Sequence, residues 1–202
     1  GQDFEGQAPD SLRQKLAAYQ AAAKTPLLIA VDEEGGTVTR VSRYRQYRDT
    51  PFRSPRSLYE GGGMEAVLLC EKEKCTLLRE LGINVNLAPV CDITTDPEAF
   101  MYDRSLGQDA DTTAMFAEQI VTLMRSYSLG SCLKHFPGYG DNLDTHVTIA
   151  IDNRPLDHFR NVDFLPFISG IDAGADSVMV SHNIITATTA SLSRACVPAR
   201  HP

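Results

Sequence analysis

Short apolar runs alternate with amphipathic stretches along this chain. Apolar residues spaced three and four positions apart predict helices over residues 10–23, 64–81, 112–127 and 156–174, the last of them broken at Pro166. Apolar runs predict strands over residues 26–32, 83–88, 131–134 and 177–181. The run over 26–32 is of the continuous kind that is buried on both faces of a parallel sheet. Strands that alternate with helices of this length predict right-handed βαβ units, so the fold class is α/β.

Each predicted strand ends in polar residues that are capable of chemistry. These residues are Asp32–Glu34, Asp92, Lys134–His135 and His182–Asn183. Polar groups at the carboxyl ends of several parallel strands are typical of the active face of a (β/α)₈ barrel, whereas an open doubly wound sheet gathers its site at one switch point. A complete barrel has eight strands and about 250 residues. The pattern therefore predicts a partial TIM barrel of about four strands.

Composition and charge exclude several classes of function. The chain has 202 residues, with 19 Lys and Arg against 26 Asp and Glu, which gives a formal net charge of −7. An acidic balance argues against nucleic-acid binding, because phosphate contacts need a basic face. No apolar run approaches the roughly 18 residues of a membrane span. No signal peptide is visible at the first residues, and five scattered cysteines without a C-x-x-C pair fit a reducing compartment, so a cytoplasmic location is favoured.

The first strand end carries three carboxylates followed by two glycines, at positions 32–36. Asp32 or a neighbour either binds sugar hydroxyls or forms a structural ion pair with Arg40. A second polar turn, at residues 103–107, contains Arg104. This arginine either clamps a ligand oxygen or pairs with a neighbouring acid, and the spacing alone does not separate these alternatives.

The third strand end leads into the most chemically suggestive loop. Lys134 and His135 precede a Gly/Pro loop that runs on to Asp144 and His146. A carboxylate two residues before an imidazole can orient the ring and fix its tautomer, which suits general acid–base work near neutral pH. A metal site built from His135, Asp144, His146 and His182 is the competing interpretation, but no fixed metal-ligand spacing is present. The third interpretation is a surface loop in which the histidine has no functional role.

Five motifs occur in order along the chain. They are Leu28–Val41, Gly82–Asp92, Asp103–Gly107, Lys134–Gly138 and Asp144–His146. Together they resemble the catalytic barrel of family 3 glycoside hydrolases, in the β-N-acetylhexosaminidase branch, from about residue 1 to 193. The Lys-His-Phe-Pro-Gly loop with its Asp-x-His sequence separates this branch from the β-glucosidase branch.

The resemblance implies a bacterial glycosidase that removes terminal β-linked N-acetylglucosamine with retention. In that branch the residue matching His146 is the general acid/base, and the one matching Asp144 pairs with it. The resemblance also assigns sugar binding to the positions matching Asp32, Arg40, Arg104, Lys134 and His135. It implies a carbohydrate substrate and no metal or organic cofactor.

The chain also departs from the family pattern. The family's nucleophile is an aspartate on a later strand, and this chain ends before the matching segment; Asp172 and Asp176 precede the fourth strand and are expected at the wrong end of a barrel. We therefore expect an incomplete barrel domain over residues 1–193, a divergent tail over 194–202, and self-association through open barrel edges. A sugar-binding remnant that needs a separate half for turnover, or a metal- or phosphate-dependent barrel enzyme, are the alternative functions.

Overall fold

The computed structural model describes residues 2–142 and 151–186. Its helical segments are η1 (Gln2–Phe4), α1 (Pro9–Ala22), α2 (Pro55–Glu80), α3 (Ala110–Ser126), α4 (Leu156–His158), the π-helical turn η2 (Phe159–Asp163) and α5 (Phe164–Asp172). Its strands are β1 (Ala30–Val31), β2 (Val85–Asn86), β3 (Gly130–Phe136), β4 (Ile151–Asp152), β5 (Ser177–Val180) and β6 (Ile184–Ile185). Asp144, His146 and the predicted tail over 194–202 lie outside the described residues.

The main sheet has four parallel strands in the order β1-β2-β3-β5. All four predicted strands are therefore present, and each pairs with the next predicted strand along the chain. A second, two-stranded parallel pair of β4 with β6 was not predicted. The prediction of an α/β fold built as a partial barrel is confirmed by this parallel sheet and its crossover helices.

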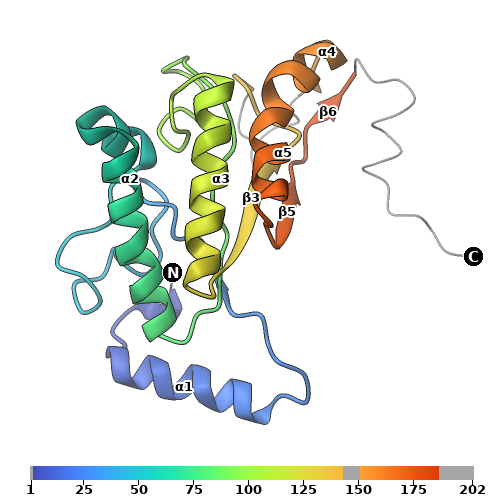
Figure 1. Cartoon of the computed structure of the whole chain (residues 1–202). Helices are drawn as coiled ribbons and strands as arrows, with labels where there is room; N and C mark the ends of the chain where they lie inside the picture. The colour runs from blue at the N-terminus through green and yellow to red at the C-terminus, as the bar shows by residue number, and fades with distance from the viewer. Residues whose placement is uncertain (1, 143–150, 187–202) are drawn as a thin grey trace, which may run out of the picture.

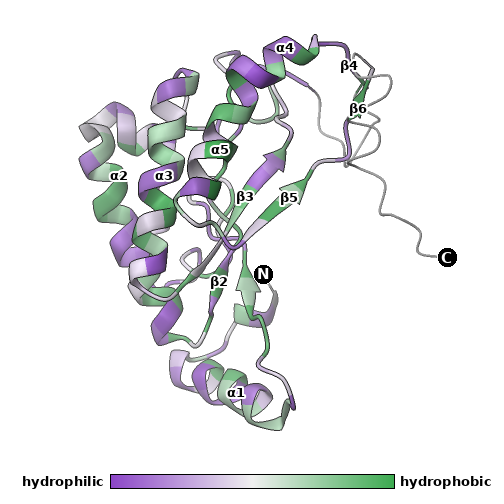
Figure 2. Cartoon of the chain, turned by 45° about the vertical axis from the view of Figure 1, so that its right-hand side comes forward, coloured by the Kyte–Doolittle hydropathy of each residue, from purple (hydrophilic) through white to green (hydrophobic). Residues whose placement is uncertain are grey.

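Helices α2, α3 and α5 stand side by side along one face of the sheet, and α1 lies across one end of it (Figure 1). Within the described chain no helix covers the opposite face, as the turned view in Figure 2 shows. The largest core cluster lies between the helices and the sheet, with Leu78, Ile83, Ile120 and Leu129 at most 1% exposed. A second cluster joins Leu133 of β3 to α3 and α5. The covered face corresponds to the outside of a barrel.

Helix α2 begins earlier than the glycine-rich sequence predicts. Ser54 caps it by accepting a hydrogen bond from the Ser57 N–H at 3.3 Å, and Pro55 occupies the first helical turn. The expected start at residue 64 lies directly after Gly62 and Gly63, which leave helical geometry. The extra length of α2 is therefore a capped helical segment before the kink, joined there to the segment that the sequence predicts.

The predicted break at Pro166 is wrong in position. Pro166 is a buried residue in the first turn of α5, and the irregular turn η2 ends just before that helix. A proline leaves the carbonyl four residues earlier, here that of Val162, without its helical donor. The N–H of Phe164 donates to the carbonyls of Phe159 and Val162, so the Val162 carbonyl still has a donor.

The run over 26–32 is not buried throughout, which corrects the prediction of a strand covered on both faces. Only Ala30 and Val31 pair with β2, and Leu28 is 83% exposed. The reason is the position of β1 at the edge of the sheet, where one flank has no neighbouring strand among the described residues.

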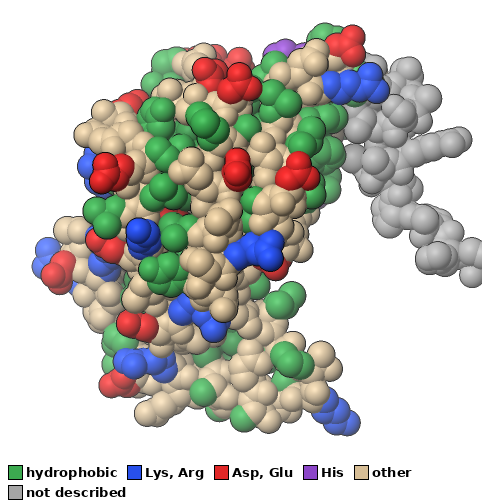
Figure 3. All heavy atoms as spheres, in the orientation of Figure 1, with side chains coloured by type: hydrophobic (Ala, Val, Ile, Leu, Met, Phe, Trp, Pro, Cys, Tyr) green, Lys and Arg blue, Asp and Glu red, His purple; other side chains and the backbone are tan. Residues whose placement is uncertain are grey.

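The surface of the helix layer is mixed in charge. On the face shown in Figure 3, acidic and basic side chains are interspersed over α2 and α3. None of the described helices has the length and apolar character required to cross a bilayer.

Candidate active site

A cleft of about 600 Å³ opens at the carboxyl ends of β1, β3 and β5. All five residues that the resemblance assigns to sugar binding line it: Asp32, Arg40, Arg104, Lys134 and His135. The remaining lining residues include Glu34, Phe100, Asp103, Tyr139, Ser181 and His182. The cleft therefore lies at the end of the sheet where barrel enzymes place their active sites.

Lys134 is the charged centre of the cleft floor. Its side chain is 2% exposed, and Nζ contacts Asp32 Oδ1 at 2.7 Å and Glu34 Oε1 at 2.6 Å. The register of β3 against β5 shifts between Lys134 and Phe136. Such an irregularity re-aims side chains that would otherwise alternate between faces, so Lys134 and His135 both line the cleft.

Arg104 forms a two-pronged ion pair with Glu34. Its Nε and Nη2 donate to the two carboxylate oxygens at 2.9 and 2.7 Å. Burial alone would raise the pKa of Glu34, but the hydrogen bond from Arg104 and the charges of Lys134 and Arg104 outweigh it and lower that pKa. Of the two alternatives for Arg104, pairing with an acid is observed, and the arginine still lines the cleft.

His135 is held between an anion and a cation. Its Nδ1 lies 2.7 Å from Asp92 Oδ2, and its Nε2 lies 3.3 Å from Arg104 Nη2. A carboxylate accepts and a guanidinium only donates. The tautomer with the proton on Nδ1 satisfies both contacts, so the ring is fixed in orientation. Asp92 is itself placed by the bond from the Cys91 N–H to the Lys134 carbonyl at 2.6 Å, which runs the segment after β2 alongside β3.

Of the two alternatives for the first strand end, the ion pair with Arg40 is not observed among the described residues, although Asp32 and Arg40 both line the cleft. The backbone N–H of Arg40, rather than its guanidinium, binds the carboxylate of Glu33, at 2.8 Å. Glu33 is fully buried and also accepts from the backbone N–H of Val41 and the hydroxyl of Ser42. This carboxylate therefore shapes the turn that carries Arg40. Within the described residues the Arg40 side chain has no carboxylate partner, and its one hydrogen bond, at 3.4 Å, is to the Thr39 carbonyl.

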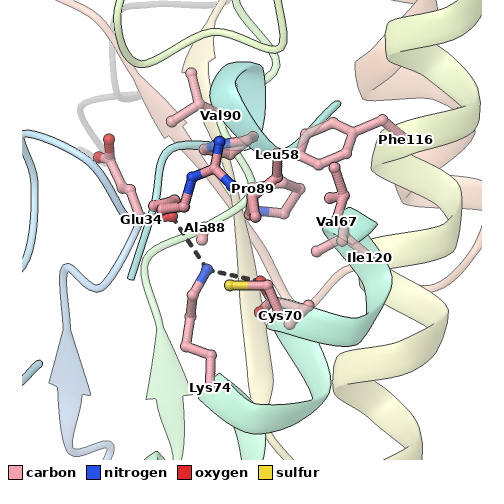
Figure 4. Close-up of a pocket in the computed structure, with 13 residues that line it drawn as sticks. Glu34, Leu58, Val67, Cys70, Lys74, Ala88, Pro89, Val90, Phe116 and Ile120 are labelled. Atoms are coloured by element: carbon pink, nitrogen blue, oxygen red, sulfur yellow. Dashed lines mark hydrogen bonds and ion pairs between the residues drawn. The ribbon is translucent and has the colours of Figure 1, made fainter. Parts of the chain in front are cut away.

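A buried ion pair on α2 contacts the backbone of Glu34 (Figure 4). Lys74 Nζ donates to the Glu34 carbonyl at 3.1 Å and pairs with Glu71 at 2.7 Å, and both side chains are nearly inaccessible. A small cavity of about 20 Å³ adjoins them, lined by apolar residues of α2, α3 and the segment after β2. Its size suits about one water molecule rather than a substrate.

Several residues of the cleft were missed as site residues from the sequence. Glu34 and Asp92 were recognised only as polar strand ends, because the pattern does not reveal which carboxylate meets which cation. Phe100 and Tyr139 contact each other with ring centroids 5.8 Å apart and form an apolar wall. The signal that could have found them is an aromatic residue close in sequence to each polar motif, since aromatic side chains contribute large apolar contact area to a binding surface.

The predicted acid–base pair, Asp144 and His146, is not among the residues whose positions are known. Across residues 2–142 and 151–186, no group of three or more His, Cys, Asp or Glu side chains could hold a metal ion. Asp176 lies at the opposite end of the sheet, where it accepts from the Ser131 N–H at 2.9 Å.

Comparison with known families decides what kind of domain this is. The N-terminal domain of glycosyl hydrolase family 3 matches residues 5–200. The chain belongs to this family. Among curated proteins, this family 3 domain is 41% identical over 174 residues to a β-hexosaminidase of Stenotrophomonas maltophilia, covering 83% of the chain and 51% of that protein. A β-hexosaminidase of Xanthomonas campestris is 39% identical over 172 residues, with 82% and 51% covered.

Solved structures agree with this assignment. A family 3 β-N-acetylglucosaminidase from Paenibacillus sp. superposes with a TM-score of 0.81 at 28% identity, covering 90% of this family 3 domain and 35% of that chain. NagZ from Neisseria gonorrhoeae, in complex with N-trifluoroacetyl-D-glucosamine, gives 0.78 at 25% identity, covering 92% and 55%. The family 3 domain described here spans about half the length of the curated relatives that it matches.

Proposed function

We propose that this family 3 domain binds the terminal N-acetylglucosamine of a β-glycoside and supplies the acid/base for its hydrolysis. The observation that carries the proposal is the cluster around Lys134, where Asp32 keeps a 36% exposed side chain within the cleft. Asp32 can accept hydrogen bonds from sugar hydroxyls, while Arg40 and Arg104 can donate to sugar oxygens. The curated relatives named β-hexosaminidase support the same substrate class.

In the proposed reaction His146 protonates the leaving oxygen and later removes a proton from water, with Asp144 orienting its ring. A second group must form the covalent bond to the sugar, because retention requires two displacements. In the family this group is an aspartate from a later strand. Among residues 151–186 neither Asp172 nor Asp176 fits that part, since Asp172 ends α5 and Asp176 precedes β5.

A second candidate is sugar binding without turnover. It is favoured by a sheet whose β1 and β5 are unpaired on one flank among the described residues. In this form the domain would hold the sugar and need a separate polypeptide to supply the nucleophile.

The decisive experiment is release of nitrophenol from an aryl β-N-acetylglucosaminide by the purified chain, measured beside His146→Ala. The aryl β-glucoside serves as the matched substrate control, because it lacks only the acetamido group. Binding of free N-acetylglucosamine is measured in parallel by ligand-observed NMR. A chelator is included, since a metal-dependent reaction would stop in its presence.

Each outcome separates the candidates. Turnover that is specific for the acetamido sugar and absent in His146→Ala supports the hydrolase. Binding without turnover, with turnover restored by the carboxyl-terminal half of a relative's barrel, supports the second candidate. A chain that neither binds nor cleaves the sugar contradicts both.

We further propose self-association through the open edges of the sheet. Val178 and Val180 on β5 are 38% and 49% exposed, and Leu28 beside β1 is more exposed still. Exposed apolar edge strands favour pairing between chains. Sedimentation velocity of the wild type and of Val180→Lys tests this: the wild type should sediment as more than a monomer and the variant less so. A wild type that stays a compact monomer at all concentrations refutes the proposal.

A further inference from the structure

The loop that carries Arg104 into the cleft has an irregular backbone. It runs over residues 93–109 between β2 and α3, and these residues, all of them described, contain no helix or strand. The loop supplies Phe100, Asp103 and Arg104 to the cleft lining. Its carbonyl groups receive no hydrogen bonds from a sheet ladder, so other donors must hold its shape.

Arg56, in the first turn of α2, binds this loop at three points. Its Nε donates to the Tyr102 carbonyl at 2.9 Å, and its Nη2 donates to the Thr94 carbonyl and to Ser105 Oγ, each at 2.9 Å. Ser105 Oγ in turn donates to the Tyr102 carbonyl at 3.1 Å. Thr94 lies near the beginning of the loop, and Tyr102 and Ser105 lie near its end. One guanidinium therefore joins the two sides of the loop.

The loop also packs closely against the guanidinium. Arg56 Cζ lies 3.8 Å from the centre of the Tyr102 ring. A Cβ on Gly107 would overlap Cζ of Arg56, and Gly107 has a positive φ of 74°. The end of the loop can approach Arg56 only because position 107 has no side chain.

The place of Arg56 is electrostatically unfavourable for its helix. The residue follows Pro55 in the first turn of α2, where the helix dipole favours acidic side chains over basic ones. Among the described residues its hydrogen bonds go to carbonyl and hydroxyl oxygens rather than to a carboxylate. The stability of α2 therefore does not account for an arginine here, whereas the loop that it binds does.

We propose that Arg56 is a positioning residue for Arg104. The Tyr102 carbonyl and the Ser105 hydroxyl lie on either side of Arg104 in the chain, so Arg56 fixes the backbone of Arg104 from both sides. This inference rests on the proposed function, since it gives Arg56 a task only if Arg104 donates to a sugar. A guanidinium suits the task because its rigid fork presents several donors in one plane, which a lysine does not.

The contacts of the Arg104 side chain make its backbone position important. Its guanidinium donates to both carboxylate oxygens of Glu34, at 2.9 and 2.7 Å, and lies 3.3 Å from His135 Nε2. A two-pronged pair of this kind is geometrically specific. A shift of the loop next to Arg104 would therefore break the pair or turn the guanidinium away from the cleft.

The test uses two variants and a matched control of the full chain. Arg56→Met removes the fork, and Ser105→Ala removes only the hydroxyl link, so it perturbs folding less. Arg53→Met is the control, because Arg53 is an exposed arginine just before the same helix and its side-chain hydrogen bonds go to Ser57. Circular dichroism and thermal unfolding confirm that each chain is folded.

The first readout needs no sugar. The arginine Nε–H groups are followed by heteronuclear NMR, and the Arg104 signal is the one that Arg104→Lys removes. Because this Nε–H donates to Glu34, its exchange with water should be slow in the wild type. Arg56→Met should speed the exchange by about 10-fold, as the loss of one or two hydrogen bonds would. Ser105→Ala should speed it by less, and Arg53→Met should leave it unchanged.

The second readout is the affinity for N-acetylglucosamine, measured by ligand-observed NMR. Arg56→Met should weaken binding by about 10-fold, and Arg53→Met should not change it. In the double variant of Arg56→Met with Arg104→Met, the affinity should equal that of Arg104→Met alone. Two residues that act through one contact give effects that do not add, whereas independent sites give effects that do.

The outcomes distinguish the inference from the proposed function. A wild type that binds the sugar, with an Arg104 exchange rate and an affinity that are the same in Arg56→Met, overturns the positioning role and leaves the proposed function standing. Additive losses in the double variant also overturn it, because Arg56 would then act independently of Arg104. A wild type that binds no sugar refutes the proposed function and this inference together. If Arg56→Met does not fold, the result for Ser105→Ala decides.

Discussion

The two ends of the four-stranded sheet use polar side chains in opposite ways. At the amino end, Asn84 accepts from the Ile29 N–H at 2.7 Å and donates to the Leu27 carbonyl, while Asp176 accepts from the Ser131 N–H. Each of these side chains satisfies the hydrogen bonding of a backbone N–H or carbonyl group. At the carboxyl end, Lys134, Asp32 and Glu34 bind one another and face an open cleft.

This difference teaches which polar residues of a strand–helix repeat are available for chemistry. A side chain that satisfies a backbone donor stabilises the fold and has little capacity left for a ligand. Charged groups that balance one another beside a cleft are pre-organised for a polar ligand, at the cost of burying charge. The contrast matches the general division of barrels into a stability face and a catalytic face.

The largest effect is expected from removing the cation at the carboxyl end. Lys134→Met leaves the buried Glu34 with Arg104 alone and Asp32 without its partner. Breaking a buried ion pair from one side typically costs about 3–5 kcal/mol. We expect the free energy of unfolding, measured in urea at pH 7, to fall by that order, with loss of N-acetylglucosamine binding.

The control for this prediction is Lys72→Met, since Lys72 is an exposed lysine on α2. An unchanged urea midpoint in Lys134→Met, equal to that of Lys72→Met, would mean that the cluster at the carboxyl end carries no stability. The comparison of the two ends would then lose its energetic basis.

An intermediate effect should separate the two ends directly. Asp176→Ala should lower the free energy of unfolding by about 1–3 kcal/mol, because the buried Ser131 N–H loses its acceptor. Its affinity for N-acetylglucosamine should be unchanged. Asp32→Ala should do the reverse, weakening sugar binding by about 10- to 100-fold with a small change in stability, since charged hydrogen bonds contribute about 1.5–3 kcal/mol. Isothermal titration and urea unfolding of both variants measure this crossover; equal effects on both properties would remove the distinction.

The smallest effect concerns acid stability. The pKa of Glu34 is lowered below its ordinary 4.5, so its ionised form stabilises the folded state above that pH, and this contribution is lost as the pH falls through the lowered value. Glu34→Gln should therefore lose less stability between pH 5 and pH 3 than the wild type, as thermal unfolding would measure. Glu118→Gln, at an exposed position of α3, is the control. Parallel acid profiles for all three chains would contradict the prediction.

Most of the fold was predictable because its signals are local. The polar residues at the carboxyl ends of the strands and the apolar runs before them identified a parallel sheet, and all four strands are present. Non-local effects account for the errors. Leu28 is exposed because β1 is an edge, which a run of apolar letters cannot reveal, and β4 and β6 pair over only two residues each.

The residues of the candidate site were largely predictable from the sequence. The ion pairs and hydrogen bonds between them were less so. Asp32, Arg104, Lys134 and His135 do meet at one cleft. The sequence did not reveal that Glu34 forms ion pairs with both Lys134 and Arg104, or that Asp92 binds His135. These contacts join residues more than 40 positions apart in the chain. The place of Asp144 and His146 stays a prediction.

The neighbour-by-neighbour order of the strands has a consequence for biosynthesis. Because β2 pairs with β1 and β3 pairs with β2, each strand can add to a sheet that has already left the ribosome. Helices α2 and α3 lie between these strands in the chain, so each hydrophobic layer can also be completed before the next strand emerges. Domains generally fold from the amino terminus as they are made. This topology therefore supports growth of the sheet during translation, with β5 added after β1, β2 and β3.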